Sequence, residues 1–234
     1  MKITITILAL TIVTFVNAQN SNTFERKWIK NDNYKMIFYS IKDTIKTVIG
    51  EIENKLEINQ GIIIQSMTFK SKMFKNDFVD VTEYHLSNLK PIFHTSNNDQ
   101  RFLTVVYGDT IHAIYRNASD KRITSYVEII NNKLNYFESS TYQNIIRWLP
   151  LKEGYTNDIA IYNYDPNSRT GIFNVKITQV ISEKYKTMKS GVRDVWKVTE
   201  LYENLNTVHY IDKEDRKIWK QEVNGGKMVM LRVE

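Results

Sequence analysis

Apolar and polar residues alternate along most of this chain after residue 19, and this period of two constrains the fold more than any other feature. Side chains of a β-strand point alternately to the two faces of a sheet, whereas one face of a helix repeats every three to four residues. In RFLTVVYGDTIHAIY, residues 101–115, two alternating runs are joined by Gly108-Asp109. Such a pair tolerates the positive φ of a tight turn, so the pattern predicts an antiparallel hairpin.

The same signature predicts two more hairpins before residue 140. Their strands are residues 35–41 and 45–52, joined at Lys42-Asp43, and residues 122–130 and 133–137, joined at Asn131-Asn132. Gly50 interrupts one of these runs, and a glycine inside a strand indicates a bulge or a sharp bend. Bends of this kind are typical of curved sheets.

Six further strands are predicted after Gly154, each ended by a turn cluster such as Asp165-Pro166-Asn167. They span residues 155–164, 171–184, 192–203, 207–211, 217–223 and 227–233. In total we expect about ten to twelve strands, enough to curl an antiparallel sheet strongly. The fold class is therefore all-β and mainly antiparallel, a curved half-barrel. Neither a repeat nor a linker divides residues 19–234, which we interpret as a single domain.

One segment departs from the period of two. In FESSTYQNIIRWLPLKEGY, residues 137–155, Ser140 and Gln143 have the spacing of a capping box, and Pro150 ends a helix. The apolar residues Ile145, Ile146, Trp148 and Leu149 recur at helical spacing. We predict a short helix over residues 140–149, lying across the mouth of the sheet. It either completes the core or roofs a cavity.

The first eighteen residues, MKITITILALTIVTFVNA, have the three-part layout of a secretory signal peptide, with small residues at Val16 and Ala18 before a cleavage point. The alternative is an uncleaved anchor, although the apolar run is shorter than the roughly 20 residues of a spanning helix. The chain contains no cysteine. Export without disulfides favours a Gram-negative periplasm, which is the predicted location.

The charge pattern argues against nucleic acid as a partner. The formal net charge is +6, but the basic residues are scattered along the strands and do not form a clustered patch. Scattered lysines are typical of a solvated face, and they are also compatible with peripheral association with an anionic membrane.

No motif of catalysis or of metal binding is present. The four histidines lie far apart, there is no G-x-S-x-G elbow and no glycine-rich phosphate loop, so we expect no catalytic residues, metal or cofactor. The acidic stretch DKEDRKIW, residues 212–219, lacks the alternating ligands and the glycine of a calcium loop. We interpret it as a turn between two strands.

Aromatic residues make up 12% of the chain, and several share one face of a predicted strand. Trp196, Val198 and Tyr202 form one such set, and Trp219 and Val223 belong to another. The same residue types fill a core or line an apolar pocket, so both interpretations stay open. For a pocket, the candidate ligand-binding residues are Ile145, Arg147, Trp148, Tyr155, Trp196 and Trp219. Arg147 would orient a polar head group, or else reach water or pair with an acid.

The order of these features resembles uncharacterised exported bacterial β-proteins of a domain-of-unknown-function family. The most specific parts are LKP at residues 89–91, RWLPLKEGY at 147–155 and the YID hairpin that precedes Arg216, and the resemblance covers about residues 35–234. These proteins look like the half-barrel of periplasmic lipoprotein carriers and their outer-membrane receptors. The resemblance implies an incomplete barrel whose concave side receives acyl chains, and it implies no catalytic residue.

The leading hypothesis is a non-enzymatic periplasmic protein that binds an apolar or lipid-like ligand between the concave sheet and the helix. A second hypothesis is an envelope interaction or scaffold module that binds another protein through edge strands or a basic face. The third is a hydrolase that acts through paired carboxylates, for which the 26 acids of the chain offer many combinations.

Overall fold

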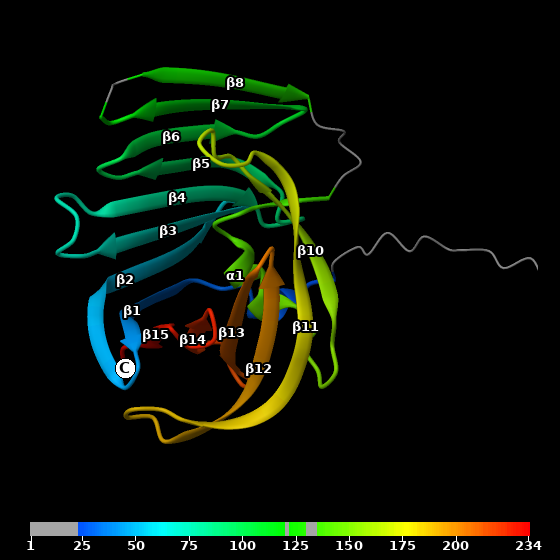
Figure 1. Ribbon diagram of the computed structural model, residues 1–234. Helices are drawn as coiled ribbons and strands as arrows, with labels where there is room; N and C mark the ends of the chain where they lie inside the picture. Colours follow the sequence, from blue (N-terminus) through cyan, green and yellow to red (C-terminus); the bar gives the residue numbers. More distant parts are fainter. Residues whose placement is uncertain (1–22, 120–121, 130–134) are drawn as a thin grey trace, which may run out of the picture.

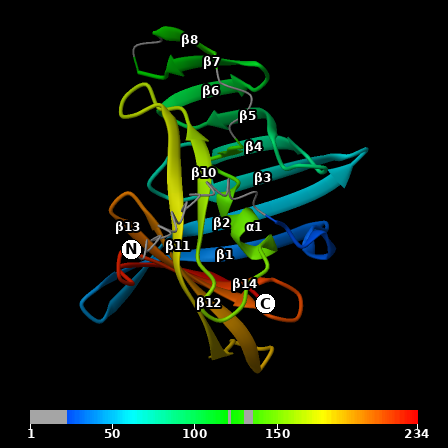
Figure 2. The same ribbon diagram turned by 90° about the vertical axis from the view of Figure 1, so that its right-hand side faces the viewer.

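The computed structural model describes residues 23–119, 122–129 and 135–234. Its strands form one sheet in the order β8-β7-β6-β5-β4-β3-β2-β1-β15-β14-β13-β12-β11-β10-β9. All neighbours pair antiparallel except β9 and β10, which are parallel. The two ends of the sheet curl toward each other with the helix α1 inside the curve (Figures 1 and 2). The expected mainly antiparallel curved sheet with one short α-helix is confirmed.

The first half of the chain builds one arm of the sheet, and the second half builds the other. The first arm comprises β1 (Asp32–Lys42), β2 (Ile45–Asn59), β3 (Ile62–Lys70), β4 (Phe78–His85), β5 (Pro91–Asn97), β6 (Arg101–Val106), β7 (Thr110–Asn117) and β8 (Ile123–Ile129). The second comprises β9 (Phe137–Glu138), β10 (Asn157–Asn163), β11 (Gly171–Lys186), β12 (Val192–Tyr202), β13 (Leu205–Asp212), β14 (Ile218–Val223) and β15 (Met228–Arg232). A 3-10 turn, η1, spans Arg26–Trp28. The fifteen strands exceed the ten to twelve expected, since several short ones lie between residues 62 and 97.

The predicted hairpins agree with the structure wherever their residues are described. β1 and β2 join at Asp43, which adopts the positive φ of 56° that such a turn requires. β6 and β7 pair as expected across Gly108-Asp109. The turn predicted at Asn131-Asn132 lies outside the described residues. Phe137, expected to end that hairpin, pairs with Ile161 of β10 instead.

Gly50 lies at a bulge, as its mid-strand position predicts. The pairing of β1 with β2 shifts between Phe38, opposite Gly50, and Tyr39, opposite Val48. The backbone of β3 comes so close here that a Cβ on Gly50 would lie 2.3 Å from the Lys70 carbonyl oxygen and 2.6 Å from the Phe69 ring. Glycine is therefore required for the close approach of two strands.

We expect Gly50→Ala to lower the free energy of unfolding by about 1–3 kcal/mol, because backbone atoms must move to admit the methyl group. Gly108→Ala is the matched control, since its Cβ would meet nothing closer than the Thr110 carbonyl oxygen at 3.7 Å. Urea unfolding followed by circular dichroism measures both variants. Equal stability of the two would contradict the close approach.

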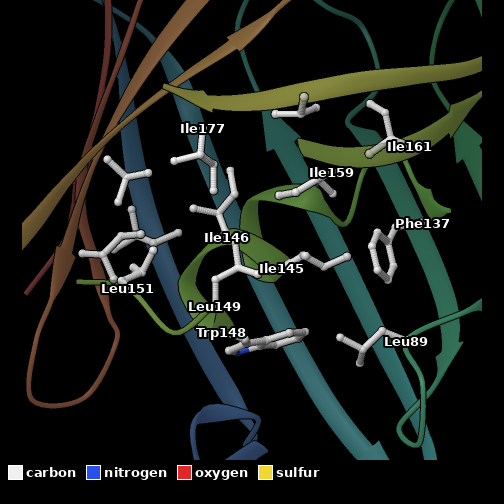
Figure 3. Close-up of a cluster of buried hydrophobic side chains, with 14 of the residues drawn as sticks. Leu89, Phe137, Ile145, Ile146, Trp148, Leu149, Leu151, Ile159, Ile161 and Ile177 are labelled. Carbon is white, nitrogen blue, oxygen red and sulfur yellow. The ribbon is translucent and has the colours of Figure 1, made fainter. Parts of the chain in front are cut away.

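The helix α1 (Tyr142–Trp148) lies in the main core. Its N-cap is Thr141, whose side chain makes no capping bond to the helix, so the predicted capping box of Ser140 and Gln143 is wrong. The physical reason is competition: the Ser140 hydroxyl donates to the carboxylate of Glu138 instead. Figure 3 shows the apolar residues of α1 packed among side chains of β9 and β10.

The helix packs into the main core on the inner face of the sheet. Ile145, Ile146, Trp148 and Leu149 are fully buried. Both roles expected for the helix are observed: its apolar residues fill the core, and Tyr142, Gln143 and Asn144 border a cavity. The residues of the predicted signal peptide lie outside the described part of the chain, and within that part no helix is long and apolar enough to cross a membrane.

Candidate functional site

An apolar cavity of about 350 Å³ opens on the inner face of β1 to β4, away from the core that surrounds α1. The turn that joins β3 to β4 and the turn that joins β5 to β6 border it. Its apolar lining is Phe38, Ile52, Met67, Phe69, Phe74 and Phe78, and its polar rim is Asn98, Asp99 and Gln100. A concave apolar site with a few polar groups at its edge is the usual form of a small-molecule pocket.

Phenylalanine rings in edge-to-face contact shape the walls of this cavity. The Phe69 ring centroid lies 5.8 Å from that of Phe38 and 6.0 Å from that of Phe74. The missing side chain at Gly50 makes room for Phe69 beside the bulge of β2. The bulge that curves the sheet thus also positions one wall of the cavity.

The turn that carries Phe74 is anchored to the opposite rim. The Asp99 carboxylate accepts hydrogen bonds from the backbone N–H groups of Lys75, at 2.6 Å, and Asn76, at 3.1 Å. The pKa of Asp99 is held below its ordinary value by the backbone N–H and the side chain of Asn76 and by the backbone N–H of Lys75. This link between two turns keeps Phe74 over the apolar cavity.

Two further cavities, lined mainly by polar residues, lie next to the apolar one on the inner face. The middle cavity, of about 150 Å³, shares Met67 with the apolar cavity. The inner cavity, of about 170 Å³, shares Asp80, Ser139 and Ser140 with the middle one. The three cavities together form a trough that is apolar at one end and polar at the other.

Glu138, which lines the inner cavity, accepts several hydrogen bonds from its own chain segment. The Ser139 hydroxyl donates to it at 3.0 Å and the Ser140 backbone N–H at 2.6 Å, and the Ser140 hydroxyl donates as well. Beside it, Nδ1 of His94 lies 2.9 Å from the Thr82 hydroxyl. This carboxylate is therefore well satisfied by neighbouring donors.

Asp80 lies at the junction of the middle and inner cavities and is less well satisfied. Burial raises the pKa of its carboxyl, which is only 8% exposed. Its Oδ1 has no hydrogen-bond partner among the described residues, and neither has Oδ1 of Asn144, which lines the middle cavity. Unmet buried acceptors are costly and mark a place where a donor would be stabilising.

The structure places three of the predicted ligand-binding residues inside the core. Ile145 and Trp148 are fully buried, and Arg147 is 4% exposed. Nη1 of Arg147 donates to Oδ2 of Asp32 at 2.6 Å, so the arginine pairs with an acid, one of the alternatives left open by the sequence. None of the three lines a cavity described above, and a role in ligand binding stays a prediction for them.

Tyr155 and Trp196 pack against the same core from its periphery, each partly buried. The Lys213 ammonium lies 4.0 Å from the centroid of the Trp196 ring, a cation–π contact. Neither aromatic residue lines the trough. Trp196 shares the main core with Val198 and Tyr202, as their common strand face predicts.

Trp219 belongs to a small separate cluster with Val195 and Tyr210. The sequence places it on one face with Val223, but Val223 lies in the main core. The pairing of β13 with β14 shifts at this position, and a bulge redirects a side chain to the other face. The indole N–H of Trp219 donates to Asp212 at 2.8 Å.

The acidic stretch forms the turn between β13 and β14, as predicted. Asp212 has a further structural role that the sequence does not indicate. Its carboxylate accepts hydrogen bonds from Arg193, at 2.8 Å, from Trp219 and from the Glu214 backbone N–H. Within the described ranges, no group of three or more histidine or acidic side chains could hold a metal ion.

The trough residues are those that sequence reasoning missed. Phe38, Met67 and Phe69 follow the same alternation as filled-core residues, so their pattern alone does not reveal a cavity. The one local signal is Gly50, whose bulge both curves β2 and admits the Phe69 ring.

Fold and trough together define a class: a protein of one curved antiparallel sheet with an amphipathic set of cavities on its inner face. The chain belongs to the family described as "Protein of unknown function (DUF3108)", which matches residues 33–234. A solved structure, a β-barrel-like protein of domain of unknown function DUF1849 from Brucella abortus, aligns with a TM-score of 0.44 at 8% identity, over 87% of this chain and 95% of its own. A comparison with curated proteins finds no match.

Proposed function

We propose that this protein is a non-enzymatic envelope protein that binds a lipid-like amphiphile on the inner face of its sheet. The observation that supports the proposal is the trough: an apolar cavity of about 350 Å³ that borders, at Met67, a cavity lined mainly by polar residues. The alkyl chain of the ligand occupies the apolar cavity, and its head group faces the polar one. The proposed site reaches α1 only at its polar end, and it is lined by other residues than the six expected from the sequence.

Burial of the alkyl chain supplies most of the affinity. Each methylene group removed from water contributes about 0.8 kcal/mol, so eight of them contribute about 6 kcal/mol before the cost of ordering the ligand. The walls are phenylalanine rings in edge contact with one another, which leaves little reorganisation to be done on binding.

The polar end of the trough supports binding better than hydrolysis. Asp80 and Glu138 both line the inner cavity, which is the arrangement that a carboxylate hydrolase would need. However, Glu138 already accepts hydrogen bonds from Ser139 and Ser140, which tie it to its own chain segment. These hydrogen bonds hold the Glu138 carboxylate in a fixed position in the cavity wall.

The proposed location is the periplasm, which rests on the signal-peptide pattern of residues 1–18. The mouth of the apolar cavity supports exchange of ligand with a membrane surface. Met73 is 74% exposed and Phe74 39%, and the exposed Lys72 and Lys75 flank them. Apolar side chains beside lysines suit an anionic bilayer surface.

Displacement of the fluorescent apolar probe N-phenyl-1-naphthylamine by 1-decanol tests the proposal. The protein should bind both, and Phe74→Asp should weaken decanol binding by about tenfold, the equivalent of about 1.4 kcal/mol, because a carboxylate replaces part of the apolar wall. Met73→Asp is the matched control: it introduces the same charge one residue away, at a side chain that does not line the cavity. Equal loss in both variants, or no binding by the original protein, would refute an alkyl-chain site in this cavity.

A further inference from the structure

In the wall of the middle cavity, several polar side chains already bond to one another. The Asn144 side chain donates its Nδ2 to Oε1 of Gln65 at 2.7 Å, and the Gln65 amide nitrogen donates to the Ser140 carbonyl at 3.0 Å. The Thr82 and Ser140 hydroxyls bond to each other at 2.8 Å. These bonds use the amide nitrogens of Gln65 and Asn144 and leave Oδ1 of Asn144 without a partner among the described residues.

Two acceptor atoms remain unmet in that wall. Oδ1 of Asp80 and Oδ1 of Asn144 have no partner among the described residues, and the two side chains are 8% and 5% exposed. They come from different elements, β4 and α1, and line the same cavity. A group that occupies this cavity must therefore donate hydrogen bonds to be stabilised.

The charge of the lining selects among donors. Asp80 is the one carboxylate or basic side chain among the residues that line the middle cavity, so its wall carries a negative charge. Arg101, His94 and Glu138 lie farther along, in the inner cavity. Glu138 adds a second negative charge in that cavity, and Arg101 carries a positive charge that partly offsets the two carboxylates. A cationic donor is favoured over a neutral one, and an anion is disfavoured.

We propose that Asp80 and Asn144 form a subsite for the ammonium head group of a long-chain amphiphile whose alkyl chain occupies the apolar cavity. This inference rests on the proposed function and names the chemical class of its ligand. An ammonium group has three donors and no acceptor, so it satisfies both oxygens at once and is neutralised by Asp80. Met67, shared by the two cavities, marks the place where the head group meets the chain.

Three ligands of equal chain length test the subsite: decylamine, 1-decanol and decanoate, each displacing the naphthylamine probe at pH 8 and low salt. We expect decylamine to bind at least about tenfold more tightly than decanol, and decanoate more weakly than both. The net charge of +6 on the whole chain would favour decanoate instead, so a preference for the amine identifies a local site.

Asp80→Asn keeps the shape of the side chain and removes its charge. The preference for decylamine over decanol should disappear in this variant, because decylamine loses the charge that neutralises its ammonium group. Glu83→Gln is the matched control, because Glu83 lies on the same strand and lines none of the three cavities. It should keep the preference.

The outcomes separate this inference from the proposed function. Equal binding of decylamine and decanol by the original protein would overturn the ammonium subsite. It would leave the proposed alkyl-chain site unaffected. If decanoate bound most tightly of the three, the ammonium subsite would also be overturned. The carboxylate head group would then be assigned to Arg101 in the inner cavity. Failure of all three ligands to bind would overturn both. The comparison in the original protein does not depend on how well any variant folds.

Discussion

Trp148→Ala is expected to lower the free energy of unfolding by about 3–5 kcal/mol, because removal of a buried aromatic side chain leaves a void that the surrounding core fills only in part. Trp148 has no exposed surface, and its ring centroid lies 6.5 Å from that of Tyr84 on β4. It joins the helix to the first arm of the sheet. Urea unfolding followed by circular dichroism gives the difference.

Trp148→Phe and Ile45→Ala are the comparisons for this variant. Phenylalanine retains a buried ring and removes an indole N–H that has no partner among the described residues, so it should cost clearly less than alanine. Ile45 is 68% exposed, and its truncation should change stability by less than about 0.5 kcal/mol. If Trp148→Ala were as mild as Ile45→Ala, the helix would not be completing the core.

Arg147→Met is expected to cost about 3 kcal/mol at neutral pH, because it leaves the partly buried carboxylate of Asp32 without its nearest partner. Asp32 would keep only the contact with Nη2 of Arg232, at 3.5 Å. Burial alone would raise the pKa of Asp32, but Arg147 and Arg232 outweigh it and hold the pKa below its ordinary value of 3.8. The double variant Asp32→Asn with Arg147→Met should recover part of the loss, which a double-mutant cycle measures.

The pH dependence of this loss follows from the direction of the shift. A carboxyl whose pKa is lowered in the folded protein contributes stability that is fully present above the unfolded pKa and is lost as the pH falls through the folded pKa. The difference between Arg147→Met and the original protein should therefore be largest above about pH 4 and should shrink at lower pH. A difference that stays constant down to pH 2 would show that the lost packing of the arginine stem, and not its charge, causes the effect.

The strands and hairpins follow from local patterns, and so they could be predicted. The period of two fixes which residues form strands, and turn residues such as Asp43 fix where the chain reverses. The pairing of β1 with β15, which sets Met36 opposite Arg232, is a long-range contact that no local pattern encodes. Local sequence patterns therefore could not predict the order of the strands in the sheet.

The trough lies apart from the six ligand-binding residues predicted from the sequence, whose role stays a prediction. A lined cavity and a filled core need the same apolar residues. In the sequence, the helix α1 was the apolar segment that stood out from the strand pattern, so the predicted site was placed beside it. The structure places Trp148 in a filled region, whereas the open space lies next to Phe69 and Phe74. The unmet oxygen of Asp80 depends on which donors the fold brings near it, which is again a long-range property.

The most direct test of a lipid-like ligand in the trough is native mass spectrometry of the protein, purified from its native cells without exposure to detergent. A bound amphiphile adds a discrete mass, and extraction into organic solvent then identifies its chain and head group. We expect such an adduct on the original protein and its loss from Phe74→Asp, whose altered side chain lines the apolar cavity. A spectrum of unliganded protein alone, from a sample that also fails to bind decanol, would contradict the account.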